Sequence, residues 1–350
     1  SHGTVCVKLQ FISQSVNARI VEPGGNEIER PIEIRTNPVT GRTSRITFSR
    51  GLETEPGTAR LPDPPPDARA TDKCPFCPPQ LERLTPRLTP GLDADGRLVR
   101  GESVLFPNLF PYAAYSAVSL FDRQHYVPIG TAATDTYRDS FVNCRRFLQR
   151  VRRQAPAMVY MAITQNHLPS AGGSLLHPHL QVHADRVAAI HFRFLEERAA
   201  AHFGATGRGL FSDYLAQEQQ DGRRVIGACG RWQWLAAFAP EGFYELWALL
   251  PGVVSLFDVT DEDWADLAEG VIRAQKFYRH LNRNGYNLGL LALENGRSRL
   301  ELRLVMLARS NHAPWVRNDH TGFEVMLGDM ATFSAPEETA RLARAFWGQH

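Results

Sequence analysis

The stretch Gly173-Ser174-Leu175-Leu176-His177-Pro178-His179-Leu180-Gln181 decides how the rest of the chain is interpreted. Its proline has a fixed φ and biases the histidine before it toward extended backbone, which predicts entry into a β-strand. Because side chains at i and i+2 of a strand share a face, both histidines, the glutamine and the later His183 are expected on one face. An imidazole beside a neutral amide donor suits attack on a phosphorus that carries negative oxygens. The alternative is a run of surface or metal-binding histidines.

A second motif, Cys74-Pro75-Phe76-Cys77, is a CxxC pair of the kind that binds zinc. A tetrahedral site needs two further ligands, and His125 and His177 are the candidates. The sequence thus predicts a structural Cys2His2 zinc site that leaves His179 free as the nucleophile. A metal that fixes His177 would also hold the neighbouring imidazole in place. The alternative is a redox pair or two unrelated thiols.

These motifs resemble the galactose-1-phosphate uridylyltransferase family, in the nucleotidyl-histidine branch of the histidine-triad superfamily. The family signature His-Pro-His-x-Gln matches residues 177–181, and an asparagine eleven residues earlier matches Asn166. A Gly-x-Ser before the signature matches Gly172-Gly173-Ser174. Further matches, in chain order, are Arg35-Thr36-Asn37-Pro38-Val39-Thr40-Gly41, Ser49-Arg50, Phe106-Pro107-Asn108, Asp213-Tyr214, Asp221-Gly222, Trp232 to Pro251, Gly285-Tyr286-Asn287-Leu288-Gly289 and Gly322-Phe323-Glu324. The similarity runs from about Arg35 to the C-terminus.

The resemblance implies a double displacement in which His179 attacks the α-phosphorus of a nucleoside diphosphate sugar and becomes nucleotidylated. Gln181 would donate a hydrogen bond to a phosphoryl oxygen, and a backbone carbonyl would orient the imidazole. The substrate-binding residues implied by the same motifs are Arg50, Asn108, Asn166, Gly173 and Ser174. The alternative for the asparagines and the serine is a role in turns or caps. His183 has no counterpart in the signature, and it is expected either at the strand surface or against a substrate.

The chain also departs from the family pattern. Better-known members hold a second metal with histidines of the second half, whereas the matching positions here lie near Leu290, Arg303 and Val305. These residues are apolar or cationic, so no second metal is expected. The positions that match the family's hexose-phosphate contacts are about Asn318, Asp319 and Met330. The acceptor pocket is therefore expected to differ from that of the family.

Composition limits the classes of protein that fit. The 350 residues are 43% hydrophobic and 22% charged, an ordinary globular composition that allows one large or two ordinary domains. A net charge of +2 gives no reason to expect nucleic-acid binding, and the arginines of 145–153 are expected on a solvated helix face. Five cysteines with one CxxC argue against a disulfide framework. With no apolar run of membrane-spanning length and no secretory signal, a cytoplasmic protein without membrane partners is expected.

The expected secondary structure repeats along the chain. In the first half, strands in 105–120 precede a helix over 134–153, a strand over 158–163 and the histidine strand. In the second half, strands in 229–250 precede a helix capped at Thr260, then strands over 286–293 and 300–307. A closing helix is expected to begin with a capping signature at Ser334-Ala335-Pro336-Glu337. The counterpart of the histidine strand, Glu301-Leu302-Arg303-Leu304-Val305, contains no histidine.

The sequence therefore predicts an α+β fold made of two histidine-triad-like halves, each an antiparallel sheet with packed helices. Residues 30–200 would carry the zinc site and the catalytic motif, and residues 201–350 would shape the site without catalytic histidines. This agrees with the paired halves of the family, which often forms dimers, so a homodimer is a possible assembly.

Three functions are compatible with these observations. The first is a nucleotidyltransferase of the hexose-1-phosphate uridylyltransferase type, which acts on a nucleotide sugar and a sugar phosphate. The second is a phosphorylase that uses the same covalent histidine and inorganic phosphate to split a nucleotide sugar or a dinucleoside polyphosphate. The third is a zinc-stabilised nucleotide-binding module without turnover, against which the intact pair of His179 and Gln181 argues.

Overall fold

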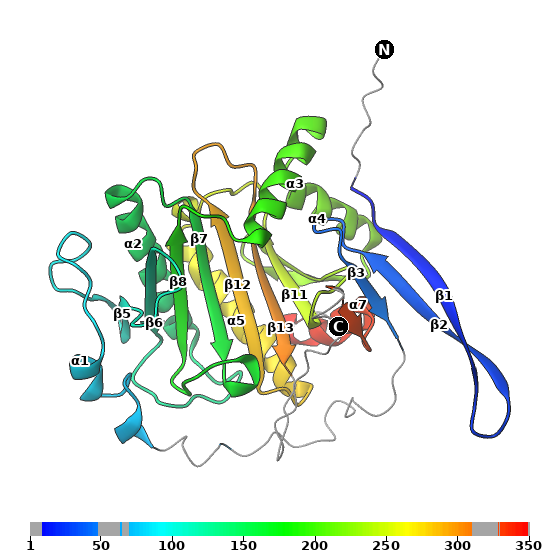
Figure 1. Cartoon of the computed structure of the whole chain (residues 1–350), viewed down its shortest axis with the longest axis horizontal. Helices are drawn as coiled ribbons and strands as arrows, with labels where there is room; N and C mark the ends of the chain where they lie inside the picture. Colours follow the sequence, from blue (N-terminus) through cyan, green and yellow to red (C-terminus); the bar gives the residue numbers. More distant parts are fainter. Residues whose placement is uncertain (1–8, 48–63, 65–69, 310–327, 329, 349–350) are drawn as a thin grey trace.

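The computed structural model describes residues 9–47, 64, 70–309, 328 and 330–348. Within them the main sheet is antiparallel and has the order β4-β5-β6-β8-β7-β12-β13-β11-β10-β9 (Figure 1). Its strands are β4 (Leu98–Arg100), β5 (Ser103–Pro107), β6 (Tyr115–Leu120), β7 (Tyr160–His167), β8 (His179–Asp185), β9 (Val225–Cys229), β10 (Trp232–Ala236), β11 (Phe243–Leu250), β12 (Gly285–Leu293) and β13 (Leu302–Arg309).

The sheet consists of two copies of one topology. In each copy three strands follow one another, a helix crosses over, and two more strands complete the set, so that β4-β5-β6-β8-β7 matches β9-β10-β11-β13-β12. The copies meet where β7 pairs with β12. The predicted α+β fold with internal duplication is therefore confirmed, whereas the division of the chain at residue 200 stays a prediction. We call β4–β8 with its helix the N-terminal repeat and β9–β13 with its helix the C-terminal repeat.

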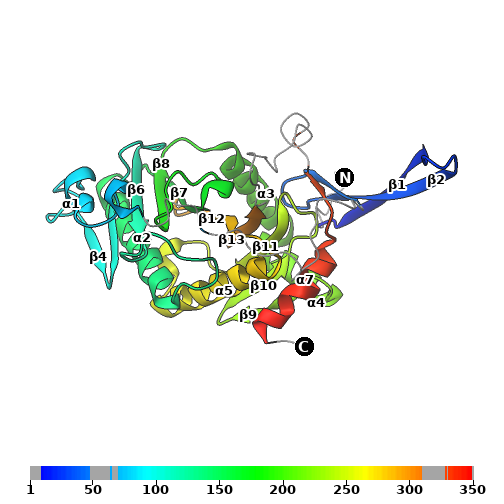
Figure 2. The ribbon, with the colours of Figure 1, turned by 90° about the horizontal axis from the view of Figure 1, so that it is seen from below.

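The crossover helices α2 (Thr134–Gln154) and α5 (Asp261–His280) pack side by side on one face of the sheet (Figure 2). Their apolar residues are buried against the sheet, and Phe141 of α2 stacks on Trp264 of α5 with ring centroids 5.4 Å apart. The capping box predicted for α5 is confirmed, because Thr260 and Asp263 exchange side-chain hydrogen bonds with each other's backbone N–H. This face forms the larger of the apolar cores of the described residues.

The arginines of α2 form only part of the solvated face that was expected: Arg153 is exposed, whereas Arg145 and Arg150 are partly buried. Arg145 donates hydrogen bonds to the carbonyl of Val259 and to Asp261, which tie α2 to the start of α5. Arg150 pairs with Asp93 in the segment before β4. A guanidinium has five N–H donors. Each of these arginines can therefore hydrogen-bond a neighbouring segment while its aliphatic carbons pack along the helix.

The two repeats differ on the opposite face of the sheet. Over the C-terminal repeat this face is covered by α3 (Ile190–Thr206) and α4 (Leu210–Asp221), which form a second apolar cluster with it. Over the N-terminal repeat it carries a smaller cluster that includes Phe76 and Leu81, from the CxxC segment and the short helix α1 (Gln80–Leu84). The face that presents the histidine strand is thus the less covered one.

A second sheet has the order β1-β2-β3-β14 and joins both ends of the chain. It consists of β1 (Ile12–Val21), β2 (Glu27–Thr36), β3 (Thr43–Ile46) and β14 (Met330–Thr332). Arg35, from the first family-like motif, pairs with Glu337 and fixes this sheet to α7 (Pro336–Arg344). Asn37 of the same motif donates to the carbonyl of Ala239. In this structure the motif therefore docks the second sheet on the C-terminal repeat.

The capping signature predicted at Ser334 is wrong. Helix α7 begins at Pro336 with Ala335 as its N-cap, and Ser334 instead hydrogen-bonds the side chain of Thr339. The fixed φ of proline suits the first helical position, which moves the helix start by one residue. Shorter helical segments are η2 (Thr71–Lys73), η3 (Pro169–Ala171), η4 (Leu256–Asp258) and η5 (Ala345–Trp347). None of the described helices combines the length and apolarity that a membrane span requires.

Candidate active site and metal site

The four predicted metal ligands come together at one edge of the N-terminal repeat. Cys74 follows η2, Cys77 precedes α1, His125 lies between β6 and α2, and His177 lies just before β8. One donor atom from each of these side chains lies within 4.8 Å of the other three. Residues about fifty and one hundred positions apart thus form a single Cys2His2 group.

The distances fit a tetrahedral ion. Sγ of Cys77 lies 3.3 Å from Nδ1 of His125 and 3.4 Å from Nδ1 of His177. Sγ of Cys74 lies 3.9 Å from the same His177 nitrogen. An ion bound about 2.3 Å from sulfur and about 2.0 Å from nitrogen would separate such donors by roughly 3.5 Å. These residues therefore suit a metal that prefers sulfur and nitrogen ligands.

Two groups of the cluster, Cys77 and His177, are uncharged at neutral pH. Burial, together with the neighbouring Cys74 sulfur, raises the pKa of Cys77 to about 12, so the Cys77 thiol resists ionisation without a counter-charge. Burial lowers the pKa of His177 to about 4, which keeps this ring neutral. Its Nε2 donates to the carbonyl of Asp122 at 3.0 Å, which leaves Nδ1 as the ligand atom facing the sulfurs. A hydrogen-bonded outer nitrogen of this kind is usual for metal-binding histidines.

His179 is the first residue of β8 and is oriented by the backbone beside it. Its Nδ1 donates to the carbonyl of His177 at 2.8 Å, so Nε2 keeps its lone pair. Burial lowers the pKa of His179 below its usual value of 6.5, and the hydrogen bond to His177 only partly opposes this. The ring is therefore neutral at pH 7 and carries a nucleophilic nitrogen.

Phe76, which the sequence did not single out, links the metal group to this imidazole. Its ring packs edge-on against His179 with centroids 5.3 Å apart, and it makes a similar contact with Phe106 of β5. Because Phe76 lies between the two cysteines, the loop that carries the candidate metal ligands Cys74 and Cys77 also contacts the imidazole of His179. Its position between the two cysteines of the CxxC motif is the one feature of the sequence that could have indicated this role.

Gln181 and His183 extend the face on which His179 lies, as predicted. Along β8 the odd-numbered side chains are partly exposed and the even-numbered ones are buried. Nδ1 of His183 lies 3.1 Å from Oγ of Ser116 on β6, and burial lowers the pKa of His183. No described residue hydrogen-bonds the side chain of Gln181, so its amide is available as a donor beside His179.

The loop between β7 and β8 brings Gly173 and Ser174 close to Asn166. A Cβ at Gly173 would lie 2.9 Å from the carbonyl oxygens of both Asn166 and Leu168, so only glycine fits. The Gly173 N–H donates to the carbonyl of Leu168 at 3.0 Å, which closes the loop. Ser174 is exposed at its surface. A compact, glycine-dependent loop of this kind lets a ligand approach the backbone closely.

Asn166 is held by the other repeat. Its Oδ1 accepts a hydrogen bond of 2.7 Å from Asn287 on β12, and Asn287 in turn accepts one of 2.9 Å from Arg309 on β13. Neither Asn287 nor Arg309 was predicted as a site residue, although Asn287 lies in a family-like motif. The second repeat thus orients one amide of the candidate site.

The remaining predicted residues contribute less to this site. Oδ1 of Asn108 accepts from the N–H of Phe110 at 3.0 Å, so this oxygen stabilises a turn, which was the alternative role. Arg50 lies outside the described residues, as do the positions Asn318 and Asp319. Met330, the third position matched to the hexose-phosphate contacts, is buried in β14 of the second sheet.

Comparison with known proteins gives one related sequence and several related folds. The chain matches no family model. An uncharacterised protein of Archaeoglobus fulgidus is 29% identical over 327 residues, which are 93% of this chain and 96% of that protein. The two chains are therefore similar over nearly all of their lengths.

Solved structures share the fold at low identity. A GalT-like protein and an ADP-glucose phosphorylase with bound ADP-glucose, both from Arabidopsis thaliana, each superpose with a TM-score of 0.68 at 19% identity, covering 89% of this chain and 98% of theirs. A uridylyltransferase structure gives 0.65 at 18%, covering 90% and 98%. The fold implied by the sequence resemblance is therefore confirmed.

Proposed function

We propose that this protein transfers a nucleoside monophosphate from a nucleoside diphosphate sugar through a covalent intermediate on His179. One observation carries the proposal: the His177 carbonyl fixes Nδ1 of His179, so that a neutral Nε2 faces the less covered side of the sheet. The amide of Gln181 lies on the same face, two residues further along β8.

In the first step Nε2 of His179 attacks the α-phosphorus, a P–N bond forms, and the bond from that phosphorus to the bridging oxygen breaks. A sugar 1-phosphate leaves with the electron pair. Positive charge develops on the imidazole, and the carbonyl of His177 stabilises it through the Nδ1–H. Gln181 would donate to a non-bridging oxygen as negative charge moves onto it.

In the second step a phosphate oxygen of the acceptor attacks the same phosphorus and the P–N bond breaks. His179 returns to its neutral form without gaining or losing a proton overall. Asn166, held by Asn287, would direct its remaining amide donors to the phosphates or the nucleotide. The loop at Gly173 and Ser174 would pass close to the same phosphates.

We propose zinc as the metal of the Cys2His2 group, with Cys74, Cys77, His125 and His177 as its ligands. The two sulfurs and two imidazole nitrogens leave no ligand position for substrate in a tetrahedral site, so the metal would be structural. Its contribution would be to fix His177, whose carbonyl orients His179, and the loop that carries Phe76.

The test is the intact mass of the protein after mixing at neutral pH with UDP-glucose, ADP-glucose, GDP-glucose or diadenosine tetraphosphate in turn. We expect an acid-labile nucleoside monophosphate adduct with at least one donor, absent from His179→Ala and present in the control His183→Ala. An adduct that persists in His179→Ala would overturn the assignment. Absence of both adduct and turnover with every donor would favour a binding module.

Inorganic phosphate is the second candidate acceptor, which would make the protein a phosphorylase. The expected change in the hexose-phosphate contacts supports it, and so does the shared fold with an ADP-glucose phosphorylase. The isolated adduct would be chased with phosphate or with a hexose 1-phosphate. Release of a nucleoside diphosphate by phosphate alone would select the phosphorylase, and formation of a new nucleotide sugar would select the transferase.

A further inference from the structure

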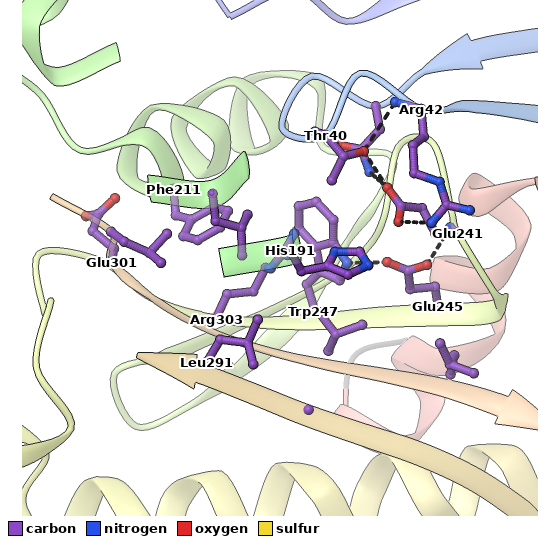
Figure 3. A pocket seen from close by; sticks show the side chains of 16 residues that line it. Thr40, Arg42, His191, Phe211, Glu241, Glu245, Trp247, Leu291, Glu301 and Arg303 are labelled. Atoms are coloured by element: carbon purple, nitrogen blue, oxygen red, sulfur yellow. Dashed lines mark hydrogen bonds and ion pairs between the residues drawn. The ribbon is translucent and has the colours of Figure 1, made fainter. Parts of the chain in front are cut away.

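A cavity lies on the covered face of the C-terminal repeat, between α3, α4 and the strands β11, β12 and β13 (Figure 3). Its volume is about 290 Å³, enough for a small organic molecule. Most of its lining is apolar, including Leu195, Phe211, Trp247, Leu291 and Val305. It lies on the same face of the sheet as His179 but at a different place, because β7 and β12 lie between β8 and β13.

One cation in this cavity has no hydrogen-bonding partner among the described residues. The guanidinium carbon of Arg303 lies 4.2 Å from the ring centroid of Trp247 and 4.9 Å from that of Phe211. By contrast, the buried Arg35 bonds to Glu337, and the buried Arg224 bonds to Glu218. Arg303 is only partly buried, so its guanidinium keeps donors that an anion in the cavity can accept.

The carboxylates of Glu245 and Glu241 attract Arg303 electrostatically, but no carboxylate of the described lining hydrogen-bonds to it. Glu241 pairs with Arg42 at 2.8 Å and also accepts from Thr40. Glu245 accepts from Nε1 of Trp247 at 2.6 Å. Glu301 accepts from the backbone N–H of Ser212 and from that of Gly252. Each carboxylate is thus committed to donors other than Arg303, as the dashed contacts around Glu241 and Glu245 illustrate (Figure 3).

We propose that this cavity binds a small organic monocarboxylate, whose carboxylate accepts from Arg303 and whose apolar body lies among the leucine, valine and aromatic side chains. The planar fork of a guanidinium matches the two oxygens of a carboxylate. A phosphate dianion fits less well, because Arg303 is the one arginine among the described lining residues without a hydrogen-bonded carboxylate, and the nearby glutamates would repel a second negative charge. The apolar lining likewise favours an organic body over an inorganic ion.

Gly289 forms part of the floor of the cavity and leaves room for this ligand. A Cβ at this position would meet no atom within 4 Å, so a larger side chain would occupy the cavity without displacing the protein. Gly289 pairs with Val305 on β13 and with Thr164 on β7. A substitution of Gly289 by a larger residue can therefore fill the cavity and leave Arg303 unchanged.

The test uses benzoate as the probe, with inorganic phosphate for comparison, and measures binding to the full chain by calorimetry and by the shift in melting temperature. We expect benzoate to bind and stabilise the wild type, with affinity reduced about tenfold or more in Arg303→Met. Gly289→Leu should abolish binding by filling the cavity. Arg299→Met is the matched control, because Arg299 also stacks on a phenylalanine, Phe203, yet does not line the cavity.

Several results would overturn the proposal. They are no binding of benzoate to the wild type, equal binding to Arg303→Met, or tighter binding of phosphate than of benzoate. If Arg303→Met does not fold, unchanged binding to Gly289→Leu still contradicts the proposal, because the cavity would then not hold the ligand. The readout is binding and not turnover, so its outcome is independent of the activity proposed for His179.

Discussion

Strands β8 and β13 occupy the same place in two copies of one topology, yet they carry different chemistry. On the face opposite α2 and α5, β8 presents His179, Gln181 and His183. On the same face β13 presents Arg303 and Val305. The fold supplies an equivalent strand to both repeats, so the difference lies in the side chains and in what covers them.

The covering segments differ as much as the strands do. Over β8 the cover is the short metal-binding segment, which places Phe76 against His179. Over β13 two helices, α3 and α4, close off a cavity around Arg303. The N-terminal repeat therefore leaves the proposed nucleophile, His179, on a less covered face, and the C-terminal repeat places Arg303 in the cavity proposed to bind a small carboxylate.

The largest expected effect is the loss of activity when His179, on β8, is replaced. Replacing His179 by alanine removes the nucleophile, and kcat should fall by about 10⁴-fold or more, since residual binding groups cannot form the covalent intermediate. His183→Ala, a change on the same face, should cost less than about tenfold. Steady-state turnover with the donor that labels the wild type is the measurement. Retention of a few per cent of kcat in His179→Ala would mean that the nucleophile is elsewhere.

The metal group belongs to the N-terminal repeat, which gives the second prediction. Cys74→Ser should remove about one zinc per chain and lower the free energy of unfolding by several kcal/mol, because a closed structural site contributes directly to folding. Metal analysis and denaturant unfolding measure the two effects. The matched control is Cys229→Ser, a buried cysteine outside the group, which should keep its metal. A metal-free wild type of undiminished stability would exclude the site.

A change at the junction between the repeats should have a smaller effect than the loss of His179 or of the Cys2His2 group. Asn287→Ala removes the hydrogen bond that orients Asn166, and kcat/KM should fall by about tenfold. Asn295→Ala is the control, because Asn295 lies in the turn after β12 and accepts from the N–H of Arg297. Equal losses in the two variants would indicate a general effect on the sheet. An unchanged Asn287→Ala would show that the C-terminal repeat does not support the site.

The smallest expected effect is that of pH. Burial lowers the pKa of His179 below 6.5, so its neutral form persists as pH falls to that value. The rate of adduct formation, followed by rapid quenching, should stay nearly constant from about pH 8 to about pH 6.5 and decline only at lower pH. A decline that already begins above pH 6.5, in the wild type and in His183→Ala alike, would contradict the assigned environment.

Local patterns in the sequence were enough to predict much of this molecule. The alternation around residues 177–183 predicted one face of β8, and Thr260 with Asp263 predicted the start of α5. The repeated order of strands and helices predicted the duplicated sheet. These signals depend on neighbouring residues or on the order of elements, which the sequence displays directly.

Contacts between distant segments could not be predicted in the same way. Asn166 and Asn287 are 121 positions apart, and only the pairing of β7 with β12 brings them together. The cavity around Arg303 depends on how α3 and α4 lie on β13, so an arginine that the sequence indicated only as an unsuitable metal ligand became a candidate binding group. The role of Phe76 likewise follows from packing that the CxxC pattern alone does not specify.

The most direct test of the asymmetry between the repeats is to locate the transferred nucleotide within the chain. The protein would be mixed with the donor that gives an adduct, quenched, digested at neutral to alkaline pH and analysed by peptide mass spectrometry. We predict that the nucleoside monophosphate is attached to His179 and to no residue of the C-terminal repeat. Attachment to another residue, or turnover with no covalent peptide at any quench time, would contradict the account.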